Sequence, residues 1–182
     1  NTVAEVTTLL DKARTQALAS ELNGEQKIPT GGYGVFFDLT SDPSSSEQKA
    51  ILFIDDWNET EGAKVNVNYA DEDIANRVLP DGIFTAGGDS EIASVAINSL
   101  KYIQLTELRG GDLAGTVWST AAGNAVTVVF RPPYAETKIV GKNSGTSAEL
   151  QNFEAEFELL TEGLIRTIKF NRVTTAPQVF KN

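Results

Sequence analysis

Apolar residues near the start of the chain recur with the period of an α-helix. They fall three or four residues apart, so one side of the helix carries them while charged and polar residues occupy the other side. This apolar stripe consists of Val3, Val6, Leu10, Ala13 and Ala17. No glycine or proline interrupts the pattern before Asn23-Gly24, a pair typical of a helix C-terminus. The pattern predicts a helix from Thr2 to about Leu22, with the stripe packed against the rest of the protein.

Beyond Gly24 the pattern changes to the alternation of half-buried β-strands. The clearest predicted strands are residues 33–39, 50–54, 65–69, 92–97, 101–105, 126–130, 153–159 and 164–170. Gly163 is expected to turn one of the last two strands into the next, and residues 71–78 are predicted as a short helix or a strand.

The chain shows no internal repeat and no linker long enough to separate two domains. We therefore expect a single domain over residues 1–182, with residues 1–23 forming the helix and residues 30–182 a β-rich region. The expected fold class is α+β, with a long N-terminal α-helix packed on antiparallel β-sheet.

Three residue types are absent from the sequence: Cys, His and Met. Without Cys there is no disulfide framework, no thiolate metal site and no cysteine nucleophile. Without His the commonest general base and metal ligand is missing. The net charge of −10, with its cations scattered along the chain, argues against binding to nucleic acid. No apolar run approaches the ~18 residues that a membrane-spanning helix requires.

Several segments carry local motifs in a consistent order. They are Ala13-Arg14-Thr15-Gln16-Ala17 on the helix, Gly32-Tyr33-Gly34-Val35-Phe36-Phe37-Asp38, Ile51-Leu52-Phe53-Ile54-Asp55-Asp56-Trp57-Asn58, Leu79-Pro80-Asp81-Gly82-Ile83, Phe130-Arg131-Pro132-Pro133 and Ile168-Lys169-Phe170-Asn171. In this order they resemble the type IV pilin-like and pseudopilin family, in particular the minor pilins of the FimT class and the type II secretion subunits of the GspH class.

The resemblance implies a pilin-like fold and a structural role. Such subunits assemble into a filament through the N-terminal helix, so the implied partners are other pilin subunits and the implied assembly residues are those of the apolar stripe. The implied location is extracytoplasmic, at the cell surface or in the periplasm, with anchoring in the inner membrane before assembly. The membrane-inserting half of the helix is not in this sequence, so we expect the chain to start partway along a longer helix.

Two other functions remain open. A minor pilin can have a binding role in adhesion or DNA uptake, although the acidic charge disfavours DNA. An unrelated secreted carbohydrate-binding β-domain with a helical lead-in is the other alternative, for which we would expect several exposed aromatic residues on one strand face.

An acidic turn follows the predicted strand at residues 50–54, and it is the one cluster that suggests a metal. Asp56, Asn58 and Thr60 place oxygen atoms at alternate positions, as calcium-binding loops do. Glycine, however, comes at the seventh position of this run, and position 67 is Val67 where such a loop needs a bidentate glutamate. We therefore expect a solvated acidic turn and no cofactor. Calcium is the alternative, with Asp55, Asp56, Asn58 and Glu61 as its ligands.

No catalytic residues are predicted. The sequence has no Gly-x-Ser-x-Gly motif and no histidine to activate a serine. Ser46 and Lys49 have Ser-x-x-Lys spacing, but they lie in a polar loop where solvation explains them. Trp118 is expected in the core, and Trp57 is a candidate exposed contact residue. We expect a protein that is not an enzyme.

Overall fold

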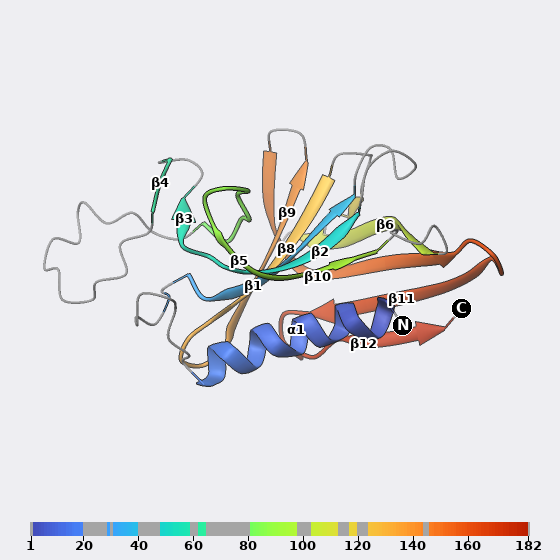
Figure 1. Cartoon of the computed structure of the whole chain (residues 1–182), viewed down its shortest axis with the longest axis horizontal. Coiled ribbons are helices and arrows are strands. Elements are labelled where there is room, and N and C mark those ends of the chain that lie inside the picture. Colours follow the sequence, from blue (N-terminus) through green and yellow to red (C-terminus); the bar gives the residue numbers. More distant parts are fainter. Residues whose placement is uncertain are drawn as a thin grey trace, which may run out of the picture.

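The computed structural model describes residues 2–19, 29, 31–39, 48–58, 62–64, 81–97, 103–112, 117–119, 124–143 and 146–181. Within these residues one helix, α1 (Thr2–Ala19), precedes a series of antiparallel strands (Figure 1). The predicted segments at residues 65–69 and 71–78 lie outside the described residues, as do residues 20–23 at the predicted helix end.

The strands of the main sheet are either largely apolar through their centre, as in β2 and β8, or alternate between apolar and polar side chains, as in β10. Their bounds are β1 (Tyr33–Leu39), β2 (Lys49–Ile54), β5 (Ser90–Ala96), β6 (Ile103–Asp112), β7 (Val117–Ser119), β8 (Asn124–Arg131), β9 (Glu136–Asn143), β10 (Thr146–Leu159), β11 (Leu164–Asn171) and β12 (Gln178–Lys181). A separate two-stranded ribbon pairs β3 (Trp57–Asn58) with β4 (Ala63–Lys64). The six predicted strands that fall wholly within the described residues are confirmed, and the one predicted at residues 101–105 is confirmed for residues 103–105. Gly163, with φ of 63°, lies in the turn that joins β10 to β11.

The main sheet is antiparallel throughout and follows the order β12-β11-β10-β9-β8-β1-β2-β5, with β6 added to β10 and β7 to β6. The 14-residue strand β10 belongs to two parts of this sheet. Its first five residues pair with β9, and its residues from Asn152 onward pair with β11. Along its second half β10 also pairs with β6, with register shifts near Leu150 and Glu156. Such irregularities bend a strand and increase its twist, which explains why the sheet curls.

Helix α1 lies in the opening of the curled sheet (Figure 1). It contacts β1, β2 and β8 on the inner face of the sheet, and β5 and β11 on either side. Both β5 and β12 end the strand order, so the helix occupies the space between the two ends of the sheet. Its N-terminus lies at the same end of the molecule as the chain's C-terminal strand (Figure 1).

Aromatic residues on the inner face of the sheet form the centre of the core. Phe37 and Phe153 have ring centroids 5.3 Å apart, and Phe170 lies 5.8 Å from both Phe153 and Phe130. All four side chains are fully buried, and the buried residues of α1 belong to the same cluster. Tilted and edge-on rings at these spacings combine a large buried area with a favourable quadrupole geometry.

The expected fold class is wrong. The described structure is mostly β, with one short N-terminal helix and a curled antiparallel sheet that forms a half-barrel, where we expected a long helix packed on a sheet in a pilin-like α+β fold. The described helix contains 18 residues. The expectation of a long helix came from the helical period of the apolar residues at the start of the chain, which does not indicate how far the sheet extends around the helix. The strands are longer than their apolar cores suggested, because cross-strand pairing extends into polar residues.

Candidate functional site

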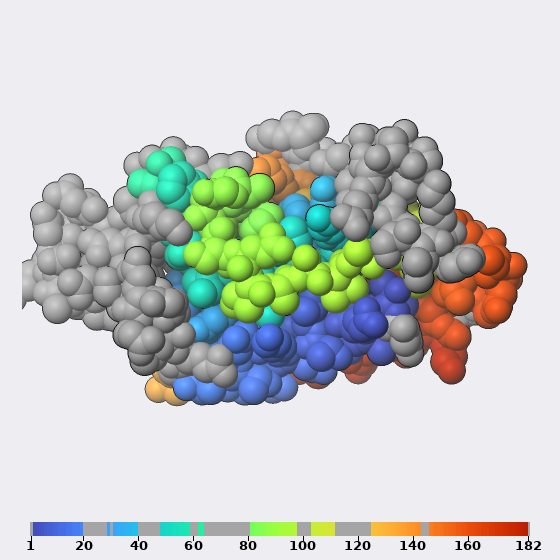
Figure 2. Space-filling view, viewed as in Figure 1, coloured from blue at the N-terminus to red at the C-terminus, as the bar shows by residue number. Residues whose placement is uncertain are grey.

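Helix α1 has two chemically distinct faces. The predicted stripe of Val3, Val6, Leu10, Ala13 and Ala17 is buried in the core, together with Leu9. The opposite face is exposed along the described helix (Figure 2, blue) and carries Ala4, Glu5, Thr8, Asp11, Lys12, Thr15, Leu18 and Ala19. The stripe therefore holds the helix in the half-barrel, and the outward face is what the helix offers to another molecule.

Two threonines on this outward face have their hydroxyl groups turned back to the helix. Thr8 Oγ1 donates to the carbonyl oxygen of Ala4 and Thr15 Oγ1 to that of Asp11, both at 2.8 Å. Ala4, Thr8, Asp11 and Thr15 follow one another at steps of three or four residues and so form one ridge. With its hydroxyls satisfied by the helix, this α1 ridge presents small side chains and one carboxylate.

A cleft of about 450 Å³ lies beside the first turn of α1. We call it the N-terminal cleft; its lining residues are Thr2, Val3, Ala4, Ile103, Leu159, Thr161, Arg166, Val179 and Lys181. Leu159 pairs in register with Ile103 on one side and Leu164 on the other. Leu164 and Val179 are 39% and 46% exposed, so apolar surface remains uncovered at this end of the molecule.

Two cations stand together at the N-terminal cleft. Arg166 on β11 and Lys181 on β12 are directly opposite in the strand register. Neither forms an ion pair with any residue in the described part of the chain. Like charges directly opposite each other destabilise a strand pair, so an anion at this position would be favourable. In a chain with net charge −10, such an unpaired cationic pair is unusual.

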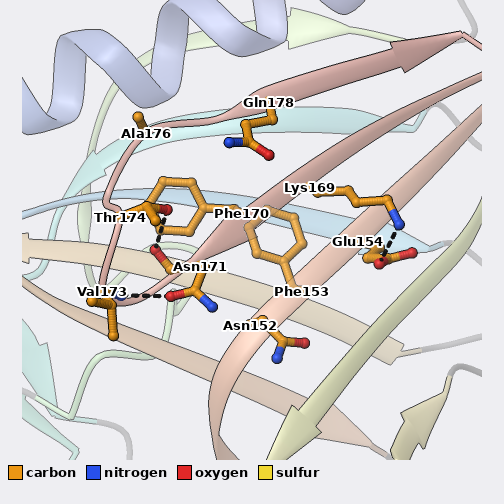
Figure 3. A pocket seen from close by; sticks show the side chains of 10 residues that line it. All are labelled: Asn152, Phe153, Glu154, Lys169, Phe170, Asn171, Val173, Thr174, Ala176 and Gln178. Atoms are coloured by element: carbon orange, nitrogen blue, oxygen red, sulfur yellow. Dashed lines mark hydrogen bonds and ion pairs between the residues drawn. The ribbon is translucent and has the colours of Figure 1, made fainter.

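A second depression, the polar groove, lies over β10, β11 and β12 and encloses about 570 Å³ (Figure 3). Its polar lining includes the side-chain amides of Asn152, Asn171 and Gln178. Glu154 and Lys169 form an ion pair of 2.7 Å across β10 and β11 in the same groove (Figure 3). The Asn171 carboxamide oxygen accepts from the Val173 amide at 2.7 Å, which holds the turn at the groove's end.

The ion pair in the groove continues into a charged row across the sheet. Arg109 on β6 lies 3.4 to 3.5 Å from carboxylate oxygens of Glu107, Glu154 and Glu156. On the other side, the Lys169 ammonium sits 5.5 Å from the ring centroid of Phe180. These charges are partly exposed and compensate one another, so the row stabilises the outer face modestly and leaves no strong excess charge for a ligand.

At the end of β2, the carboxylates of Asp56 and Asp89 each accept a hydrogen bond from a main-chain amide in the other's segment. Asp89 Oδ1 accepts from the amides of Asp56 at 3.0 Å and Trp57 at 2.9 Å, and its Oδ2 accepts from the amide of Thr85 at 2.7 Å. Asp56 in turn accepts from the Ser90 amide at 3.1 Å and the Ser90 hydroxyl at 2.9 Å. We call this pair the aspartate clasp; it fixes the segment before β5 to the end of β2.

Asp55 lies beside the aspartate clasp and is only 1% exposed. Its Oδ2 accepts from the Gly82 amide at 3.2 Å, while its Oδ1 has no hydrogen-bond partner among the described residues. Burial raises the pKa of Asp55 well above its usual value, the carboxylates of Asp89 and Asp81 raise it further, and Lys138 opposes this rise. Burial also raises the pKa of Asp89 to about 6. Both carboxyl groups therefore take up a proton at a higher pH than an exposed aspartate does.

The calcium candidates are only partly brought together. Asp55 is buried, Asp56 is engaged with Ser90, and Asn58 pairs with Ala63 in the small ribbon. Glu61 lies outside the described residues. Among the residues that the structure describes, no group of three or more acidic, His or Cys side chains is arranged to hold a metal ion. The carboxylate oxygens of Asp89 already accept hydrogen bonds from the amides of Trp57 and Thr85, which occupy lone pairs that a bound cation would need.

Sequence reasoning missed Asp89 and Lys138. Asp89 follows two glycines and belongs to no periodic pattern, yet its carboxylate binds main chain more than thirty positions earlier. Lys138 donates from Nζ to the carbonyl oxygen of Asp81 at 2.5 Å. It thus holds one end of the segment of residues 81–89, and the Asp89 carboxylate holds the other. Trp57 is half-buried and packs over Gly88, whereas the Trp118 side chain lies outside the described residues.

No protein-family model matches the chain, and neither a curated protein nor a solved structure matches it. Within the described residues, no helix is both long and apolar enough to cross a membrane. The resemblance to minor pilins therefore stays a prediction from local motifs, and function has to be argued from the geometry of the surfaces described above.

Proposed function

We propose that the chain is a structural subunit, a pilin or pseudopilin of a type IV pilus or type II secretion-like filament, and that it assembles through α1. The partners are other subunits of the same kind, and the place of action is extracytoplasmic, at the cell surface or in the periplasm. The chemistry of the subunit is association and not catalysis.

The observation that carries this proposal is the exposure of the outward face of α1. The helix is held in the half-barrel by a fully apolar stripe, yet the sheet leaves its other side uncovered from Ala4 to Ala19. In Figure 2 the helix forms part of the surface, with residues 81–97 (green) along its upper border. A helix presented in this way can contact neighbouring subunits without disturbing the core that anchors it.

Protection of the outward face tests the proposal. The chain has no cysteine, so a Thr15→Cys variant carries a single thiol on the exposed side of α1. The protein is attached to vesicles through an N-terminal tag, which raises its effective concentration as membrane insertion would. Assembly through α1 covers this thiol, so we expect a bulky maleimide reagent to label Thr15→Cys much more slowly on the vesicles than in dilute solution.

The matched control places the thiol on a distant strand, in a Lys142→Cys variant at the end of β9. If α1 mediates assembly, the thiol of this control is labelled at the same rate on vesicles and in dilute solution. Equal protection of the two thiols, or protection of neither, would contradict assembly through the helix.

The polar groove favours a second candidate, binding of a neutral carbohydrate. Three amide side chains around an internally neutralised ion pair offer donors and acceptors without net charge, which suits hydroxyl groups. Titration with neutral oligosaccharides, followed by amide NMR shifts, tests this role. Shifts at Asn152 and Gln178 that vanish in a Gln178→Ala variant would support it, and their absence at high ligand concentration would rule it out.

A further inference from the structure

Three features of the N-terminal cleft indicate that it binds another molecule. It is lined on one side by the apolar residues Ile103, Leu159 and Val179, and on the other by the first turn of α1. Its two cations, Arg166 and Lys181, lack an acidic partner among the described residues. Exposed leucines extend the apolar surface around it, Leu160 at 45% and Leu164 at 39%. An apolar floor with a cationic rim fits an amphipathic segment that carries an acidic group.

The α1 ridge has the complementary chemistry. Ala4, Thr8 and Thr15 are small, and the hydroxyls of both threonines are bonded to helix carbonyls, so methyl groups face outward. Asp11 lies in the middle of the ridge, is exposed, and forms no ion pair with the described residues. Small side chains allow a helix to approach a surface closely, and one central carboxylate can meet both cations of the cleft.

We propose that the N-terminal cleft of one subunit receives the α1 ridge of a second copy of this chain, with Asp11 of that copy between Arg166 and Lys181. This inference rests on the proposed function and specifies which surfaces meet. The cleft and the ridge are different parts of the same molecule, so the contact is heterologous. Each subunit then keeps a free ridge and a free cleft, and the contact propagates head to tail into an open chain.

Charge complementarity favours a second copy as the occupant. Two copies of net charge −10 repel each other overall, so they associate best where a carboxylate of one meets cations of the other, and docking of Asp11 relieves the repulsion between Arg166 and Lys181. The apolar part of the contact is modest, so a single contact is weak and many together give a stable polymer. Weak individual contacts also explain how a subunit could remain monomeric when dilute.

A charge exchange tests the contact directly. We expect the wild-type chain on vesicles to associate in a salt-sensitive manner, measured by fluorescence energy transfer between labelled copies. Arg166→Glu and Asp11→Lys should each weaken association at least tenfold. The double variant Asp11→Lys/Arg166→Glu places the exchanged charges opposite each other at every contact, and it should recover association toward the wild-type level.

The matched control is Lys142→Glu, which makes the same charge change on β9 and should leave association within about twofold of wild type. Thermal melts of every variant establish that folding is intact. A Thr8→Cys and Thr161→Cys pair, each on a separate copy, should cross-link to a heterodimer, which gives a readout independent of charge.

The outcomes separate the inference from the function on which it rests. If wild-type copies associate and the Thr15→Cys thiol is protected, but Arg166→Glu and Asp11→Lys have no effect, another surface receives α1 and the inference is wrong while the proposed function stands. If wild-type copies do not associate at all, both are wrong. If Arg166→Glu weakens association but Asp11→Lys does not, the cleft binds a different acidic segment, and the assignment of the α1 ridge is overturned.

Discussion

The side-chain amide of Gln48 pairs with the main chain of Leu105 as a neighbouring strand would. Its Nε2 donates to the Leu105 carbonyl oxygen and its Oε1 accepts from the Leu105 amide, both at 2.8 Å. The carbonyl oxygen of Gln48 also accepts from the Ile97 amide at 2.8 Å. Gln48 is completely buried, so one residue before β2 joins the end of β5 to β6.

Replacing Gln48 should therefore be costly. Gln48→Ala leaves a buried donor and a buried acceptor of Leu105 without partners, and we expect the free energy of unfolding to fall by about 2 to 4 kcal/mol. Urea denaturation measures this change. Gln104→Ala, at the neighbouring half-buried position on β6, is the control and should cost less than ~1 kcal/mol. Similar losses in the two variants would show that the paired hydrogen bonds contribute little.

The buried carboxyl groups near the aspartate clasp predict the pH dependence of stability. The folded-state pKa of Asp89 is about 6 and that of Asp55 is well above its usual value, whereas aspartates in the unfolded chain have a pKa near the ordinary 3.8. The folded state thus binds these protons more tightly than the unfolded state. Their stabilising contribution is complete below the unfolded pKa and is lost as the pH rises through the folded pKa.

We therefore expect these two residues to make the protein less stable as the pH rises from about 4 to 7. Asp55→Asn removes one ionisable group while keeping an oxygen for the Gly82 amide, so it should flatten this decline and equal or exceed wild-type stability at pH 7. Chemical denaturation over this pH range provides the measurement. An Asp55→Asn variant with the same slope as wild type would show that Asp55 is ionised in the folded protein.

The contact between Trp57 and Gly88 predicts a sharp steric limit. A Cβ atom at Gly88 would lie 2.6 Å from Trp57 Cγ, so the indole or the loop has to move. We expect Gly88→Ala to destabilise the protein by about 1 to 3 kcal/mol and to shift the tryptophan emission. Gly111→Ala is the matched control, because the nearest atoms there are 3.6 Å away. The prediction is contradicted if Gly88→Ala keeps both the stability and the emission of wild type.

Local patterns predicted the elements well and their assembly poorly. Alternation of apolar residues gave the bounds of β1 as they are found, because one face of that strand is fully buried in the core. The 14-residue length of β10 was missed, since only residues 153–159 stand out as an apolar alternation. The half-barrel depends on how β10 divides its partners between β9 and β11, which is a property of pairing and not of any single segment.

The sites were harder to predict for a related reason. The acidic residues Asp55 and Asp56 were identified as a cluster, but their environment depends on Asp89 and Lys138, which come from other segments. Gln48 lies 57 residues from Leu105 and in a polar stretch that suggested solvation. Polar side chains that bind distant main chain leave no periodic trace, so sequence patterns alone do not reveal them.

The two faces of α1 give a final pair of matched variants. Leu10 is completely buried on the stripe, whereas Leu18 is 50% exposed on the outward side. Leu10→Ala should lower the free energy of unfolding by about 2 to 5 kcal/mol through lost burial and a residual cavity, and Leu18→Ala by less than ~1 kcal/mol. Both changes preserve helix propensity, so thermal or urea unfolding isolates the packing contribution. If Leu10→Ala lowered the free energy of unfolding as little as Leu18→Ala, the stripe would not be what anchors α1 in the half-barrel. The outward face of α1 would then not be held in a fixed position for assembly.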